Sequence, residues 1–146
     1  MTDTPFSSTI SAIESLWGSG WTGHDGIPVY WHHNSADIVP SRATTDYWVH
    51  LAVEFDDEYA IAWGQGPKQS ERELRGCVVI RVFAGRGLGE SIMLGLLDDA
   101  ITVFRGQRVG PLSFIGDIVQ QQPGASDDGG FWIRSALACF TFRFKG

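Results

Sequence analysis

Hydrophobic residues near the start of the chain follow the period of an α-helix. Five of them recur at steps of three and four residues: Phe6, Ile10, Ile13, Leu16 and Trp17. This spacing places them on one face of a helix. Serine and threonine residues just ahead can cap the helix, and the glycines that follow can end it. We therefore predict a helix over Ser7–Trp17.

The period then changes to two, which is typical of strands. Ile27–Trp31 predicts a short strand, and Pro28 confines it to a sheet edge or a strand start because proline cannot donate to a ladder. Asp46–Phe55 alternates cleanly and predicts a half-buried antiparallel strand. The acidic triplet at 56–58 predicts a turn. Tyr59–Trp63 would then return as the second strand of a hairpin, with Trp63 in a core position.

The middle of the chain predicts a loop, a strand and a second helix. Gly64–Glu73 is polar and has no apolar period, so we expect a flexible loop, followed by a third strand over Leu74–Phe83. The helix begins at Leu88 or Gly89 and ends at Phe104. Its predicted buried stripe consists of Leu88, Ile92, Leu96, Ala100, Val103 and Phe104.

The last third predicts two more strands, Leu112–Gln120 and Phe131–Phe144, with a polar loop at Gln121–Gly130 between them. The element order is thus α–β–β–β–β–α–β–β. Consecutive strands with two helices indicate an α+β fold built on an antiparallel sheet of about six strands. At 146 residues the chain suits one domain, residues 1–146.

Composition and charge reduce the number of function classes that suit the chain. The formal net charge is −6, which opposes non-specific binding to nucleic acid because phosphate backbones favour basic surfaces. We see no leader segment and no apolar run long enough to cross a membrane, and we expect an intracellular soluble protein. Cys77 and Cys139 lie in strand patterns without metal-ligand spacing. Buried free thiols in a reducing compartment are the favoured interpretation, with a cross-strand disulfide as the alternative.

Gly85-Arg-Gly-Leu-Gly89 is the segment that most resembles an enzyme motif. It is similar to the acyl-CoA-binding turn of N-acetyltransferases, in which backbone N–H groups at a helix start hold pyrophosphate. The alternative is a tight connection between a strand and a helix. The chain lacks the downstream strand, helix and aromatic turn of that family, which favours the packing interpretation.

Other candidate sites are weaker. Adjacent His32 and His33 would point to opposite faces of an extended segment, so a zinc site is disfavoured. The carboxylate pair Asp127 and Asp128 lacks the spacing of a calcium loop, and it suits a turn before glycine. No serine has the context of a catalytic triad. Trp48 lies on the strand face opposite Val49 and is a candidate for a subunit interface. We predict no catalytic, cofactor or metal residues.

Several segments, in their order and spacing, resemble the tail terminator proteins of long-tailed bacteriophages. The first are Pro28-Val-Tyr-Trp31 closing on Asn34, a loop ending at Pro40, and Tyr47-Trp-Val-His-Leu-Ala-Val53. The others are Arg75-Gly-Cys-Val-Val-Ile-Arg-Val-Phe83, Gly87-Leu-Gly89 and Ala100-Ile-Thr-Val-Phe104. The resemblance runs from about Ile10 to Phe144. It departs at His32-His33 and at Ala84, where prolines are expected.

The resemblance implies a structural protein without catalysis. It implies an antiparallel sheet with two helices packed on one face, and a hexameric ring on the head-proximal end of the tail tube. Such a ring stops tube polymerisation and contacts the head connector, in the virion or in the bacterial cytoplasm during assembly. Another head–tail adaptor is a further alternative. We expect the two polar loops, with Lys68 and Arg72 on one and Asp127 and Asp128 on the other, to order at an interface with a neighbouring subunit or the tube.

Overall fold

The fold was obtained as a computed structural model, which describes residues 4–33, 46–64, 70–85, 88–114, 118–120, 124–125 and 131–146. The described residues form two helices and eight strands. In chain order these are α1 (Pro5–Gly20), β1 (Val29–Trp31), β2 (Tyr47–Ala62), β3 (Glu71–Gly85), α2 (Glu90–Phe104), β4 (Arg108–Val109), β5 (Leu112–Ser113), β6 (Ile118–Gln120), β7 (Gly124–Ala125) and β8 (Phe131–Lys145).

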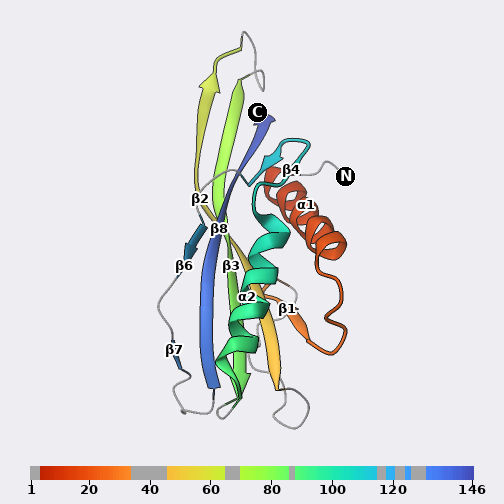
Figure 1. The fold of residues 1–146 in the computed structure, drawn as a ribbon. Helices are drawn as coiled ribbons and strands as arrows, with labels where there is room; N and C mark the ends of the chain where they lie inside the picture. Colours follow the sequence, from red (N-terminus) through yellow and green to blue (C-terminus); the bar gives the residue numbers. More distant parts are fainter. Residues whose placement is uncertain are drawn as a thin grey trace.

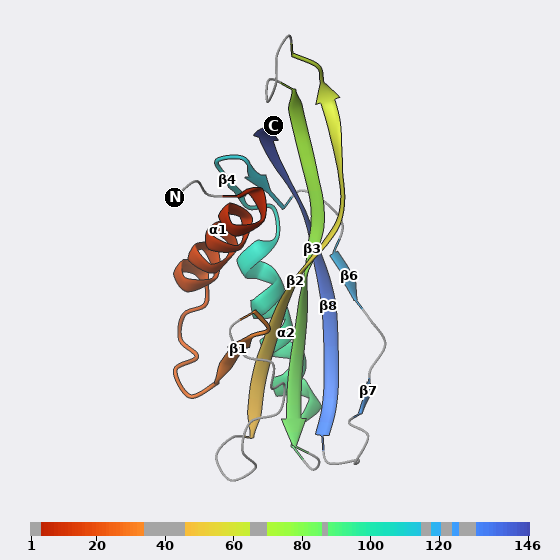
Figure 2. The same cartoon turned by 180° about the vertical axis from the view of Figure 1, so that it is seen from behind.

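One sheet contains all of these strands, in the order β1-β2-β3-β8-β5-β4, with β6 and β7 also paired to β8. Its centre is antiparallel, and β1 alone runs parallel to its neighbour, β2. Figures 1 and 2 show a tall, twisted sheet with both helices on the same face. The predicted α+β class and the antiparallel sheet with two helices are confirmed. Pro28 directly precedes β1 at the edge, as its missing N–H requires.

The predicted hairpin at 56–58 is wrong, because β2 continues through the acidic triplet to Ala62. The register with β3 shifts between Phe55 and Asp57, as in a β-bulge. An extra residue bends a strand without ending it, so polar residues can pass through at this point. The loop predicted at Gly64–Glu73 is also shorter than expected, because β3 begins at Glu71.

The final third also differs from expectation. The strand predicted over Leu112–Gln120 is divided into β5 and β6, and β7 lies inside the predicted loop at Gln121–Gly130. All three of these strands pair with β8. The long last strand is confirmed, and it ends one residue later than predicted. One 15-residue strand therefore serves as the common partner of several short ones.

Helix α1 begins two residues before the predicted start because Thr4 and Ser7 form a capping box around Pro5, and it continues to Gly20. Helix α2 runs from Glu90 to Phe104, close to the prediction. Its buried face differs from the predicted stripe: Ile92 is 55% exposed. The residues of α2 that are buried are Met93, Leu96, Leu97, Ala100, Ile101, Val103 and Phe104.

Aromatic rings connect the helices to the sheet. Trp17 on α1 lies 5.8 Å from Phe104 on α2, measured between ring centroids, and Phe104 lies 5.0 Å from Phe114. The chain of rings continues through Phe140 on β8, which is 5.6 Å from Phe114. Aromatic pairs at such separations stabilise a core beyond their burial alone. Trp17, which the sequence places on the apolar face of the first helix, is buried in this core.

Gly76 lies where the backbone of β2 and a ring of β8 approach β3 most closely. A Cβ atom built there would stand 2.8 Å from the Phe140 ring and closer still to the carbonyl oxygen of Glu54. No side chain fits between these atoms. The glycine thus allows the three long strands to pack under the aromatic rings.

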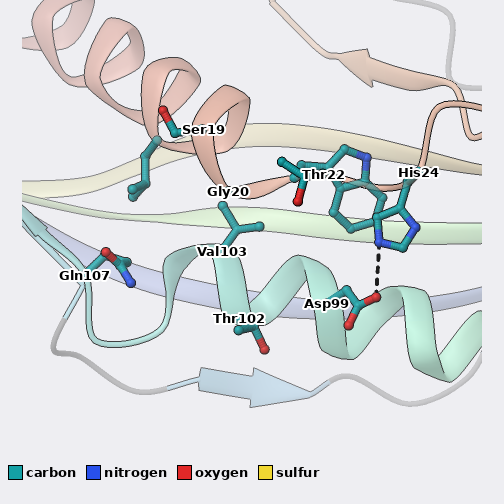
Figure 3. A pocket seen from close by; sticks show the side chains of 10 residues that line it. Ser19, Gly20, Thr22, His24, Asp99, Thr102, Val103 and Gln107 are labelled. Atoms are coloured by element: carbon teal, nitrogen blue, oxygen red, sulfur yellow. Dashed lines mark ion pairs between the residues drawn. The ribbon is translucent and has the colours of Figure 1, made fainter.

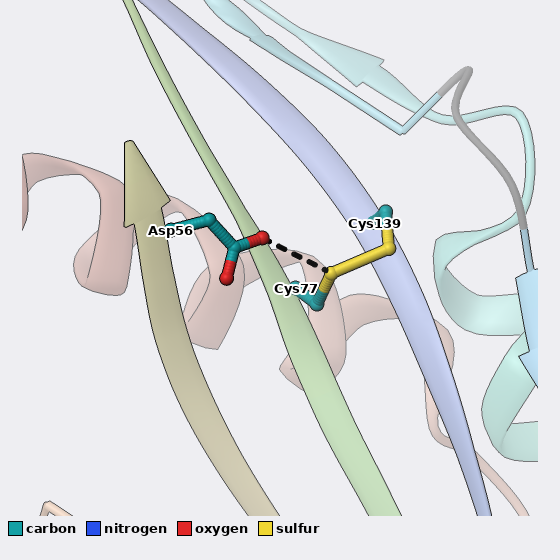
Figure 4. Close-up of a disulfide and its surroundings, with 3 residues drawn as sticks. All are labelled: Asp56, Cys77 and Cys139. Carbon is teal, nitrogen blue, oxygen red and sulfur yellow. Dashed lines mark hydrogen bonds between the residues drawn. A yellow bond between two sulfur atoms is a disulfide. The ribbon is translucent and has the colours of Figure 1, made fainter. Parts of the chain in front are cut away.

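The two cysteines form a disulfide between β3 and β8, so the favoured prediction of free thiols is wrong (Figure 4). Cys77 and Cys139 are directly opposed in the ladder, with their Cα atoms 4.0 Å apart. Both are half-buried on the sheet face away from the helices, and the carboxylate of Asp56 lies 3.9 Å from the sulfur of Cys77. Alternation had placed both cysteines in strands, but it could not show that their positions are paired.

Candidate functional site

Trp48, the predicted interface residue on β2, is buried in the single chain with 1% of its surface exposed. Its ring stacks on Phe83 of β3 at 5.0 Å with the planes 1° apart. The ring therefore packs against the sheet and presents almost no surface to a neighbour. Residues 48–52 are buried on both faces of β2, whereas the sequence predicted a half-buried strand.

Arg72 lies in β3 and not in a loop, and its guanidinium donates to the Glu58 carboxylate on β2 at 3.2 Å. The other predicted interface residues, Lys68, Asp127 and Asp128, lie outside the described residues. Asn34 and Pro40, which contribute to the family resemblance, lie outside them too. The expected ordering of the two polar loops at an interface with a neighbouring subunit or the tube therefore stays a prediction.

A charged cluster occupies the free end of β2, β3 and β8. Glu73 is largely buried there and accepts a hydrogen bond from the Tyr59 hydroxyl. Arg75 and Arg143 lie 3.9 and 4.0 Å from its carboxylate, and the Arg75 guanidinium stands 4.7 Å above the Tyr59 ring. The hydrogen bond to Glu73 raises the pKa of Tyr59 above its usual value. This cluster joins three strands, and no local pattern indicates it because Tyr59 and Arg143 reach Glu73 only through strand pairing.

Trp63, which the sequence placed in the core, follows the last residue of β2 and is 84% exposed. The misinterpretation came from the predicted hairpin: with a turn at 56–58, Trp63 would lie back against the sheet. Because β2 continues instead, Trp63 is carried to the far end of the strand pair. In Figure 1, β2 and β3 extend beyond the helices at that end.

The glycine-rich segment that resembles an acyl-CoA turn connects β3 to α2. Gly89 caps the helix without a side-chain hydrogen bond, and its carbonyl accepts from the Tyr47 hydroxyl at 3.2 Å. Glu90 in the first turn pairs with Arg134 on β8. Glu90 thus adds a negative charge to the first turn of α2, the turn at which a phosphate would have to bind. An apolar cavity of about 510 Å³ opens beside this turn, and it is lined by Ala84, Leu88, Gly89, Glu90, Met93, Trp132, Ile133 and Arg134.

A second cavity, of about 480 Å³, lies between the ends of α1 and α2 (Figure 3). His24 contacts the Asp99 carboxylate at 3.1 Å there, and its ring stacks on Trp21 at 4.1 Å. Ser19 lies across the hollow from His24 in Figure 3. The dashed line in that figure is the ion pair between His24 and Asp99. Ser19 and His24 do not hydrogen-bond to each other, so this pair is not a serine activated by histidine.

The other three histidines do not form one cluster. His33 contacts Glu14 on α1 at 2.7 Å, whereas His32 lies beside His50, with ring centroids 5.7 Å apart. Within the described part of the chain, no group of three or more histidine, cysteine, aspartate or glutamate residues could hold a metal ion. Over the same residues, no helix has the length and apolar character that a membrane crossing requires.

His50 on β2 is fully buried, and neither ring nitrogen has a hydrogen-bond partner among the described residues. Burial is the largest cause that lowers its pKa from 6.5 to about 4, and the positive charge of Arg81 and the neighbouring His32 contribute to the same shift. The ring is therefore neutral at pH 7. It is a pH-sensitive element of the sheet that the sequence pattern identified only as an alternating polar position.

Comparison with known proteins gives a structural likeness to this fold. No family model matches the sequence, and no curated protein matches it. One solved structure is similar over the full length, with a TM-score of 0.60 and 17% identical residues, covering 100% of this chain and 99% of that chain. At that identity the likeness shows the fold alone. This arrangement of sheet and helices therefore occurs in at least one other protein of almost the same length.

Proposed function

We propose that this protein is a structural tail terminator of a long-tailed bacteriophage or prophage. It caps the tail tube as a hexameric ring, stops polymerisation and contributes to the surface that joins the head. Its partners are other copies of itself, the tube protein and the head–tail connector. It is not an enzyme, uses no cofactor, and binds neither a membrane nor a specific nucleic-acid sequence. It is present in the virion tail, or in the host cytoplasm during assembly.

The observation that carries this proposal is where the family-like segments lie. Residues 28–31 include β1, residues 47–53 lie in β2 and residues 75–83 lie in β3, and these three strands are adjacent in the sheet. Residues 100–104 end α2, the helix that packs on β3 and β8. The two helices on one face of an antiparallel sheet are the arrangement that the resemblance implies. The segments therefore form one connected unit rather than scattered similarities.

Two further features support a structural role. β2 and β3 project beyond the helices, and the charged cluster around Glu73 ties their free end to β8. A stiff projecting arm suits contacts with neighbouring subunits in a ring. The disulfide suits a protein that works outside a reducing cytosol, which a released virion does.

The experiment combines this protein with the tail tube protein that the proposal assigns to it as a partner. We expect the two to co-sediment as tubes with this protein at one end only. An absence of binding to the tube would contradict the proposal. Titration with acetyl-CoA addresses the enzyme alternative, since micromolar binding would assign the Gly85–Gly89 turn to a cofactor. Binding to the connector without binding to the tube would favour another head–tail adaptor.

A further inference from the structure

Trp63 is the most exposed large apolar side chain among the described residues, at 84%. It stands at the end of β2, next to the paired residues Ala62 and Glu71. The ladder between the strands and the hydrogen bond between Arg72 and Glu58 hold this end of the arm in place. Tryptophan is among the residue types most enriched in binding hot spots, because it buries a large area at small entropic cost.

The cavity beside the start of α2 is apolar and therefore complements an exposed tryptophan ring. Leu88, Met93, Ile133 and the ring of Trp132 give it apolar walls, and Trp132 is itself 45% exposed. Glu90 and Arg134 form an ion pair at its edge. Its volume of about 510 Å³ falls within the range of roughly 300–1,000 Å³ that is usual for pockets holding compact ligands. An indole ring is smaller than such ligands, so this volume is sufficient for one.

The tryptophan and the cavity cannot meet within one chain. Ala62 pairs with Glu71 at one end of β3, and the cavity residue Ala84 lies at the other end of that strand. A strand rises about 3.3 Å per residue, so the two sites are on the order of 45 Å apart. The sheet between them is a continuous ladder that does not fold back.

We propose that Trp63 of one subunit inserts into the cavity of Leu88, Met93, Trp132 and Ile133 on a second copy of this chain. The chain itself supplies both halves of the contact, one at each end of its longest dimension, and this identifies a second copy as the occupant. Two different surfaces then join head to tail, and such contacts close into a ring or continue as a filament. The inference rests on the proposed function in taking self-assembly as the protein's role.

Two substitutions separate the halves of this contact. Trp63→Ala removes the inserted ring, and Gly89→Glu places a carboxylate at the cavity. The glutamate is compatible with folding: a Cβ at Gly89 meets no atom within 4 Å, and a negative charge is favourable at a helix start. Inserting an indole beside an unpaired carboxylate is unfavourable. We expect each variant to self-associate at least about 30-fold more weakly, the loss typical of a hot spot.

Matched controls are available on the same elements. Ile61→Ala shortens another exposed apolar residue on the arm, and Gly95→Glu adds the same charge to an open position on α2. Both should assemble as the wild type does. A mixture of the two contact variants provides the decisive result. One intact Trp63 and one intact cavity remain, so we expect a 1:1 heterodimer and nothing larger, measured by sedimentation velocity and native mass spectrometry.

Three outcomes would overturn the inference. They are wild-type assembly of either contact variant, a mixture that stays monomeric, and a wild type that stays monomeric at about 1 mM, where even a contact of about 4 kcal/mol is half-formed. Tube capping is measured separately with the same variants. Capping that survives the loss of this contact would reject the inference and retain the proposed function. Rings that assemble through this contact but do not bind the tube would support the inference and contradict the proposed function.

Discussion

Reduction of the disulfide between Cys77 and Cys139 should destabilise the protein strongly. The bridge closes a long loop, because its two cysteines are separated by 62 positions in the sequence. A crosslink removes conformational entropy from the unfolded chain, and the loss grows with the logarithm of loop length. For a loop of this size the chain-entropy relation gives about 4 kcal/mol at 25 °C. Domains are typically stable by about 5–15 kcal/mol, so the bridge contributes a large share.

The assay is urea unfolding of the oxidised protein and of the same protein kept in a phosphine reductant. We expect the reduced midpoint to fall by about 1.3–4 M, since the urea slope of small proteins is about 1–3 kcal/mol/M. A Cys77→Ala, Cys139→Ala variant should unfold near the reduced midpoint and should not respond to the reductant. Thiol titration of the unfolded, unreduced protein should detect no free thiol.

Equal midpoints for the oxidised and reduced protein would refute the claim that the disulfide stabilises the fold by restricting the unfolded chain. Two free thiols per chain in protein purified and unfolded under air would refute the pairing itself. The variant distinguishes loss of the bridge from side effects of the reductant. Any midpoint shift that the variant shows on adding reductant measures such side effects directly.

Three further predictions concern the sheet. Stability should fall by about 2 kcal/mol between pH 7 and 5, because the unfolded His50 (pKa 6.5) takes up a proton before the folded one (about 4). The unfolding midpoint of His50→Gln should lack this component. Gly76→Ala should cost about 1–3 kcal/mol in a urea melt, because the added methyl meets the backbone of β2 and a ring of β8. Tyr59→Phe should remove the hydrogen bond to Glu73, lowering the urea midpoint, and in spectrophotometric titration it should abolish the tyrosine that ionises above the usual pKa.

Each of these predictions has a control. Gly95→Ala adds the same methyl in open space on α2 and should stabilise by about 0.5–1 kcal/mol; a loss equal to that of Gly76→Ala would contradict the packing account. For His50, identical pH profiles of wild type and variant between pH 7 and 5 would contradict the lowered pKa. For Tyr59, a variant that titrates like the wild type would place the perturbed ionisation on another residue.

Period and alternation predicted the helices and the long strands because these features depend on local burial. The helix ending at Phe104 and the strand over Phe131–Phe144 were predicted nearly in full. Where the sequence misled, the cause lies in pairing between distant segments. Three acidic residues at 56–58 suit a turn, but a partner strand and a bulge hold them extended. No local signal reports such a partner.

The candidate site was harder to predict for the same reason. Cys77 and Cys139 are opposed only because β3 and β8 align in one register, and Glu73 meets Tyr59 and Arg143 by the same alignment. The exposure of Trp63 depends on β2 continuing past the acidic triplet. Residue types and spacing identified the segments that resemble a family. The side-chain contacts of the candidate site depend instead on which strands pair and in which register.

Electron microscopy of tail tubes tests the central claim most directly. Tube protein is polymerised alone and in the presence of this protein, and the tube lengths and ends are recorded. The proposed role predicts shorter tubes whose growth stops, each with a ring at one end. Tubes of unchanged length with bare ends, at concentrations where this protein is folded and in excess, would contradict it.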